Sequence, residues 1–264
     1  MASFTAKDVQ ALRRSTGVGM LDAKRALEES EGDMEKARLW LRERGKAQSA
    51  RLADREASQG AVALAVTGRA AAIVELRCET DFVAKAESFV NLTDELAQLV
   101  AGRGEDAVAE RADAIDDLRT TLKENINVGQ VVRFETGADS VVGTYLHMQS
   151  GRGVNAVLVE MRGGSDELAH DVAVHVAFAR PTYLRREDVP HEEVEAERAT
   201  VERISRNEGK PEAALPKIVE GRMNGWFKER VLLDQPYARD EKRTIAEVVQ
   251  GAEIVRFAQV VVGN

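Results

Sequence analysis

The stretch Ala70-Ala-Ala-Ile-Val-Glu-Leu-Arg-Cys-Glu-Thr-Asp-Phe-Val-Ala-Lys85 is the most informative part of this chain. Its first half is a nearly continuous apolar run, which predicts a buried strand over residues 70–77. A helical pattern follows over residues 84–100. Thr80 and Asp81 suit the start of that helix, because a hydroxyl accepts from the free backbone N–H groups and a carboxylate favours the positive end of the helix dipole.

The same pattern occurs a second time. Residues 73–81 align without gaps on residues 158–166, and each copy follows a shorter apolar segment and precedes a helical pattern. Two strand–strand–helix units predict a core of two related α+β subdomains. Both copies carry a hydroxyl and an aspartate at the helix start, but Phe82 aligns with Glu167. The fold itself therefore does not require an aromatic side chain at this position.

Phe82 has two interpretations. It lies four residues before Ala86 and seven before Phe89, a spacing that would continue the buried stripe of its own helix. Alternatively it is exposed and contacts a partner, which its absence from the second copy favours. Asp81 fits a dipole partner better than an acid catalyst. We expect Cys78 to be an inert buried thiol.

Residues 1–45 predict a bundle of three short helices separated by glycine-containing turns. Residues 46–58 are polar and alanine-rich, which predicts a linker or a frayed helix. Met20 and Leu21 begin the second helix, where they either close the bundle or form an apolar patch for a partner. The sequence favours neither interpretation.

The remaining chain predicts a core interrupted by an insertion. Residues 59–140 form the first core subdomain in this prediction, and residues 141–183 with 231–264 form the second. Residues 184–230 carry two amphipathic helical stripes joined by a break at Gly209-Lys-Pro211, which predicts an inserted antiparallel helical hairpin. The predicted fold class is therefore α+β.

Composition narrows the class of partner. The formal net charge of -8 over 264 residues argues against general nucleic-acid binding, which needs clustered Lys and Arg. No run approaches the ~20 apolar residues of a membrane span, and the N-terminus lacks a secretory signal pattern. A single cysteine excludes an internal disulfide framework. We expect a cytoplasmic protein with a protein partner, without membrane or nucleic acid.

Motifs of catalysis are missing from the sequence. It has no nucleophile elbow, no phosphate-binding loop and no zinc-protease motif. Its four histidines and one cysteine lack the spacing of a metal site. We expect no bond chemistry, no cofactor, no metal and no directly bound nucleotide.

Together, the motifs resemble the elongation factor Ts family, the bacterial guanine-nucleotide exchange factors for elongation factor Tu. The resemblance covers nearly the whole chain. The motifs that carry it are Leu12-Arg-x-x-Thr16-Gly-x-Gly19-Met20-x-Asp22-x-Lys24-x-Ala26-Leu27, Glu79-Thr-Asp81-Phe82-Val-Ala-Lys85, Glu124-Asn-Ile-Asn127, Tyr145-x-His147, His175-Val-Ala177, Glu220-Gly-Arg-Met223 and Gln235-Pro236.

The resemblance implies a ubiquitin-associated-like N-terminal domain, a two-part core and a helical arm. It also implies that Asp81 and Phe82 wedge against helices of the GTPase domain of elongation factor Tu, disturb its Mg²⁺ and phosphate site, and release GDP so that GTP can bind. Three groups of residues are implied in partner contact. They are Thr80, Asp81, Phe82, Val83 and Lys85 in the wedge, Leu12, Arg13, Met20 and Leu21 in the N-terminal domain, and Tyr145 and His147 in the second subdomain.

Other features stay open at this point. Leu21 departs from the family pattern, which has methionine at both this position and position 20. The arm over residues 184–230 either pairs two copies as a homodimer or heterotetramer, packs on its own core, or contacts the partner. We expect no contacts of the extra C-terminal module that some members carry. A non-exchanging adaptor and an enzyme are the alternative functions.

Overall fold

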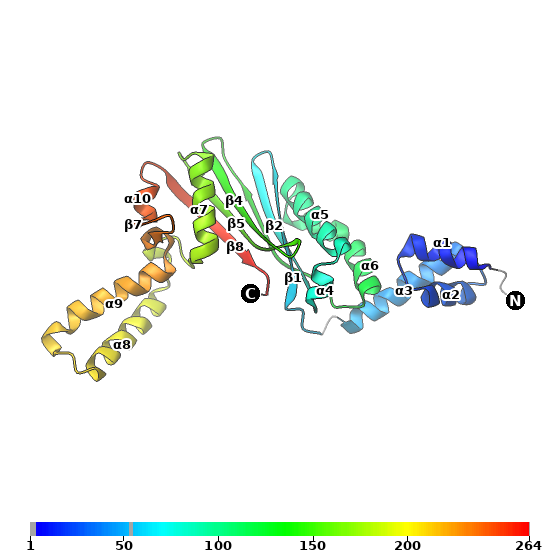
Figure 1. Cartoon of the computed structure of the whole chain (residues 1–264), viewed down its shortest axis with the longest axis horizontal. Helices are drawn as coiled ribbons and strands as arrows, with labels where there is room; N and C mark the ends of the chain where they lie inside the picture. The colour runs from blue at the N-terminus through cyan, green and yellow to red at the C-terminus, as the bar shows by residue number, and fades with distance from the viewer. Residues whose placement is uncertain (1–3, 53–54, 264) are drawn as a thin grey trace. The chain divides into compact units, whose positions relative to one another are not determined.

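The computed structural model describes residues 4–52 and 55–263. Helices and small sheets alternate along the chain in a mixed α+β fold, as predicted (Figure 1). Two compact units comprise Met1–Arg133, Leu146–Asn155 and Val260–Asn264 in the first, and Phe134–Tyr145 and Ala156–Gln259 in the second.

Three helices begin the chain, as the sequence predicts: α1 (Ala6–Thr16), α2 (Met20–Glu29) and α3 (Met34–Leu52). α1 ends at Gly17, whose φ of 70° favours glycine. Apolar side chains of the three helices pack into one small core. Because α3 continues to Leu52, the first part of the segment predicted as a linker or frayed helix is helical.

The first sheet contains three strands in the order β1 (Gln59–Thr67), β2 (Ala70–Cys78) and β3 (Asn127–Glu135). β1 and β2 are antiparallel, and their register runs from the pair Gln59 and Cys78 to the pair Thr67 and Ala70. Almost every residue of β2 is buried, which confirms the strand predicted from its apolar run.

Helices cover this sheet on one side (Figure 1). α5 (Glu87–Arg103) packs against β1 and β2 and supplies Phe89 to the core. The short helix α4 (Asp81–Ala84) precedes it, and η1 (Glu105–Arg111) and α6 (Ala112–Leu122) follow.

The second sheet has the order β4 (Ser140–Gln149), β5 (Arg152–Arg162) and β8 (Glu253–Val261). Ser150 and Gly151 join β4 to β5 with φ values of 53° and 80°, as a two-residue hairpin turn with positive φ at both positions requires. α7 (Asp166–Ala179) packs its apolar side chains against those of β5.

Two long helices leave this core as a hairpin (Figure 1). α8 (His191–Asn207) and α9 (Leu215–Arg230) pack together through Val201, Val219 and Met223. The remaining short elements are η2 (Arg186–Asp188), η3 (Glu212–Ala214), η4 (Leu232–Asp234), β6 (Pro236–Tyr237), β7 (Asp240–Thr244) and α10 (Ile245–Val248). None of the described helices combines the length and apolar character that crossing a membrane requires.

Both copies of the sequence repeat form a buried strand followed by a capped helix. Thr80 accepts from the N–H of Val83, and Ser165 accepts from the N–H of Leu168, which confirms both predicted caps. Each strand also buries a glutamate at the same repeat position. Glu75 is paired with Arg77, and Glu160 with Arg256.

A buried histidine ties α7 to the chain that follows α9. His175 Nδ1 accepts from the N–H of Ala238 at 3.2 Å, so Nε2 carries the proton and donates to Gln235 Oε1 at 3.1 Å. The Gln235 amide in turn donates to the carbonyls of Ala179 and Glu229. Burial lowers the pKa of His175 from its ordinary value of 6.5, because the interior disfavours the imidazolium.

This lowered pKa predicts an acid-sensitive fold. Below about pH 6.5 the unfolded chain binds a proton that folded His175 resists, so the free energy of unfolding falls as the pH drops. Urea unfolding at about pH 7.5 and pH 5.5 should show a smaller pH dependence for His175→Gln than for wild type. His170→Gln, which changes an exposed histidine of the same helix, is the control. Equal pH dependence of wild type and His175→Gln would contradict the prediction.

Candidate functional site

The junction after β2 is a single helical turn rather than the start of a long helix. Thr80 has extended backbone angles and caps α4, with its hydroxyl 3.4 Å from the N–H of Val83. Lys85 ends α4, and Ala86 is extended again, with φ −64° and ψ 134°. α5 then starts anew at Glu87. The sequence prediction of one helix beginning at residue 84 was wrong in this respect.

The break decides against one of the two interpretations of Phe82. The Phe82 side chain is 82 % exposed, whereas Phe89 is 0 % exposed in the hydrophobic core between α5 and the first sheet, the first core. Residues seven apart share a face only on an uninterrupted helix, and the extended Ala86 interrupts it. The interpretation of Phe82 as a core residue is therefore wrong for this structure.

An ion pair joins Asp81 and Lys85, the residues before and after Phe82 in this turn. Lys85 Nζ lies 2.5 Å from Asp81 Oδ2, and this hydrogen bond lowers the pKa of Asp81. The charge of Arg152 acts in the same direction. Val83 is half-buried and packs against the first core. The turn thus presents one aromatic ring beside an ion pair and anchors itself through the residue after the ring.

Cys78, the last residue of β2, is hydrogen-bonded to the start of this turn. Its thiol is fully buried and donates to the carbonyl of Thr80 at 3.2 Å. Burial raises the pKa of Cys78 to about 12, since the interior disfavours a thiolate. The prediction of a buried thiol is confirmed, and a nucleophilic role does not fit this environment.

A second exposed apolar surface lies on the N-terminal helices. Leu21 is 81 % exposed and Met20 is 45 % exposed, so neither side chain closes the bundle. They line an open groove of about 470 Å³. The complete lining is Phe4, Thr5, Ala6, Lys7, Val9, Gln10, Met20, Leu21 and Lys24.

The sequence interpretation missed Phe4 in this groove. Its signal was the capping box of α1, in which Thr5 and Asp8 bond each other's backbone N–H groups. An apolar residue just before such a cap often packs on the fifth residue after it, and Phe4 and Val9 line the groove together.

The other predicted residues divide by exposure. Arg13 is exposed, but Leu12 is fully buried in the core of the N-terminal helices. We therefore give Leu12 a packing role and leave it out of the contact surface. On β4, His147 is exposed and Tyr145 is half-buried against the hydrophobic core between α7 and the second sheet. As alternate residues of one strand, both side chains point to the same face.

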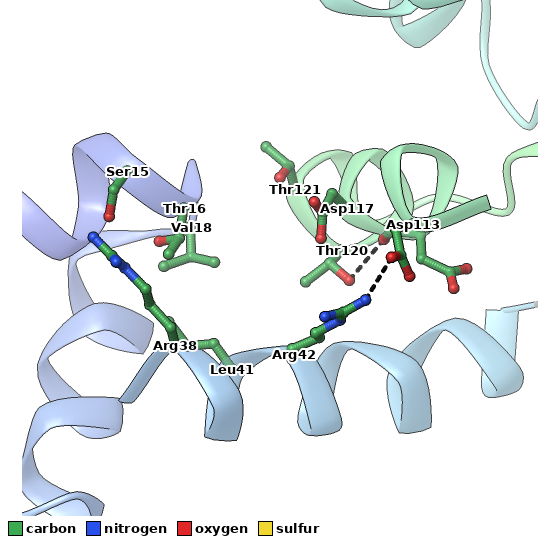
Figure 2. Close-up of a pocket in the computed structure, with 11 residues that line it drawn as sticks. Ser15, Thr16, Val18, Arg38, Leu41, Arg42, Asp113, Asp117, Thr120 and Thr121 are labelled. Carbon is green, nitrogen blue, oxygen red and sulfur yellow. Dashed lines mark hydrogen bonds and ion pairs between the residues drawn. The ribbon is translucent and has the colours of Figure 1, made fainter. Parts of the chain in front are cut away.

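A polar cavity of about 340 Å³ lies between α1, α3 and α6 (Figure 2). Arg42 donates to Asp113 across it at 2.5 Å, and this bond raises the pKa of Arg42. A Cβ on Gly45 would lie 2.7 Å from Thr120 Oγ1, so α3 approaches α6 closely. None of the residues predicted for partner contact lines this cavity. The cavity lies where α3 packs against α6.

The described residues offer no candidate metal centre. No three His, Cys, Asp or Glu side chains among residues 4–52 and 55–263 are grouped as ligands of one ion.

Comparison with known proteins gives one consistent family. A family model described as elongation factor TS matches residues 79–264. Elongation factor Ts of Kineococcus radiotolerans is 46 % identical over 266 residues, which cover 96 % of each chain. The corresponding proteins of Clavibacter michiganensis subsp. michiganensis and Streptomyces coelicolor are 44 % and 43 % identical over 277 residues, covering each chain completely.

The exposure of Phe82 predicts that its side chain adds little to stability. Phe82→Ala should change the free energy of unfolding by less than ~0.5 kcal/mol, the usual range for an exposed site. Phe89→Ala is the matched control, because it empties a core position and should cost ~3–5 kcal/mol. Urea unfolding followed by circular dichroism measures both. A loss in Phe82→Ala as large as that in Phe89→Ala would show that Phe82 is buried in solution.

Proposed function

The chain belongs to the elongation factor Ts family, and on that premise we propose that it is a guanine-nucleotide exchange factor for elongation factor Tu. In this proposal it binds the GDP form of its partner and promotes release of GDP, so that GTP can take its place. It breaks no covalent bond. The observation that carries the proposal is Phe82, an almost fully exposed aromatic on a single helical turn anchored to a buried strand.

An exposed aromatic on a rigid support suits a wedge. Burying a phenylalanine side chain is favourable by ~1.5–3 kcal/mol, and Phe82 leaves most of that free energy available for a partner. Its support is fixed, because Ala84 and Val83 pack into or against the first core. A ring held in this way can separate two partner helices without first ordering its own backbone.

Release of GDP then follows from competition. GDP is held in a GTPase mainly through its phosphates and a bridging Mg²⁺. Helices moved by the wedge would shift the loops on the metal side, so exchange factor and nucleotide each lower the affinity for the other by the same factor. This role requires no nucleotide, metal or cofactor site in the exchange factor.

Further contacts would hold the wedge in place. Asp81, now paired with Lys85, would exchange that ion pair for groups of the partner. Arg13, Met20 and Leu21 supply an exposed N-terminal contact with the GTPase domain in this proposal. Tyr145 and His147 on β4 would face the partner's third domain.

The proposal includes a division of the chain and a cellular location. Residues 1–45 form a ubiquitin-associated-like domain, two related subdomains form the core, and residues 184–230 form an arm that serves dimerisation or partner contact. The translation partner places the protein in the cytoplasm.

The apolar groove favours a second candidate, an adaptor without exchange activity. Its open, mainly apolar lining around Leu21 suits recruitment of a partner helix. In that case the N-terminal helices would carry the function and the core would be a scaffold. The maximal rate of GDP release separates the two candidates.

We predict that Phe82→Ala slows GDP release strongly. Release of fluorescent GDP from elongation factor Tu, followed by stopped flow at saturating exchange factor, should slow by at least about tenfold, the equivalent of ~1.4 kcal/mol. Phe178→Ala is the matched control, because Phe178 is 79 % exposed on α7. An unchanged rate for folded Phe82→Ala would refute the wedge.

We predict a different effect for Leu21→Ala. Loss of an anchoring side chain should raise the concentration for half-maximal rate by roughly tenfold and leave the maximal rate of GDP release near wild type. A titration of the rate against concentration of the variant measures both quantities. If Leu21→Ala abolished binding altogether, so that the core made no contribution of its own, the result would instead support the adaptor.

A further inference from the structure

A carboxylate distant in the sequence accepts hydrogen bonds from the residues just before the turn that carries Phe82. Glu124 lies between α6 and β3 and is half-buried. Its Oε2 accepts from the backbone N–H groups of Glu79 and Thr80, each at 3.0 Å. Its Oε1 accepts from the Thr80 hydroxyl at 2.5 Å. One side chain thus receives three hydrogen bonds from two consecutive residues.

Hydrogen bonds also run in the opposite direction, from the segment before β3 to the end of β2. Glu79 Oε1 accepts from the N–H of Asn125 at 2.7 Å. Asn125 is buried, and its amide donates to the carbonyl of Arg55 at 2.6 Å. The end of β2 and the segment before β3 therefore hold each other through both side chains and both backbones, which limits rotation at either side.

This arrangement fixes the helix cap. The Thr80 hydroxyl has one proton, which it donates to Glu124, so its lone pairs are left to accept from the N–H of Val83. α4 is only four residues long, and a helix of one turn has too few internal bonds to persist alone. Its direction, and with it the direction of the Phe82 side chain, depends on this cap.

The second repeat copy provides an internal comparison. Ser165 caps α7 in the same way, at 3.1 Å from the N–H of Leu168. Gly164 stands where the first copy has Glu79, so the second copy lacks the side chain that accepts from the N–H of Asn125 in the first. α7 continues for 14 residues, and Glu167 replaces Phe82. The copy with the glutamate contacts is therefore also the copy with the short turn and the exposed aromatic.

We propose that Glu124 is a positioning residue for nucleotide exchange: it holds Thr80 as the cap of α4 and so keeps Phe82 directed at the partner. The inference rests on the proposed function, since it explains how the wedge stays rigid. Glu124 itself need not touch the partner. The motif Glu124-Asn-Ile-Asn127 thereby gains a role that composition and spacing did not assign.

A double-mutant cycle tests this role. Glu124→Ala should slow GDP release from elongation factor Tu by about tenfold at saturation. In a Phe82→Ala background the same change should have almost no further effect, because Glu124 acts through Phe82. Glu124→Gln keeps a carbonyl acceptor for the two backbone N–H groups and should restore much of the rate. An equal loss from Glu124→Ala in both backgrounds would overturn the proposal.

Matched controls separate positioning from general destabilisation. Glu105 in η1 also accepts from a backbone N–H, that of Arg133 at 3.0 Å. Glu105→Ala should leave the maximal rate near wild type. Thermal unfolding of each variant shows that it is folded at the assay temperature.

A second measurement does not depend on exchange activity. Hydrogen exchange of the Val83 amide, followed by NMR in the free protein, should accelerate at least about tenfold in Glu124→Ala and much less in Glu105→Ala. Unchanged protection of Val83 would refute the positioning role even if the protein had no effect on elongation factor Tu. Conversely, wild type and Phe82→Ala could release GDP equally while the Val83 amide loses protection in Glu124→Ala. That result would contradict the proposed function alone.

Discussion

The extended backbone of Ala86 between α4 and α5 is the constraint on which the proposed activity depends. A continuous helix would place Phe82 on the face of Phe89 and draw it into the first core. The break ends that continuity after one turn, so one aromatic is buried and the other stays in water. In the proposed function, the free energy that folding could have gained from burying Phe82 is available for association instead.

The turn that exposes the Phe82 ring is held in place by contacts with its neighbours. Almost every residue of β2 is buried, and the Cys78 thiol donates to the carbonyl of Thr80. Glu124 accepts from the backbone N–H of Glu79, and the Glu79 side chain accepts from that of Asn125. Asp81 and Lys85 form an ion pair, which a partner's charges would replace in the proposed function. A site held by its supporting contacts loses little entropy on binding. In the proposed function, the N-terminal groove would add a separate contact through its own apolar residues.

Local features were predictable from the sequence, and features that depend on distant contacts were not. The strand at Ala70–Cys78 and the caps at Thr80 and Ser165 follow from patterns within a few residues. Periodicity could not separate exposed Phe82 from a core residue, because it assumes an unbroken helix. Leu12, Met20 and Leu21 come from one motif, yet packing of three helices buries only the first. The role of Glu124 depends on a partner 44 residues away in the chain.

In the proposed function, elongation factor Tu covers the Phe82 side chain. Cys78 is buried, with a pKa raised to about 12, so Phe82→Cys introduces a single reactive thiol. Its labelling by a small maleimide should be fast in the free protein and at least about tenfold slower with saturating elongation factor Tu and GDP. Wild type gives the background. Equal labelling rates in the free protein and in a verified complex would contradict the account.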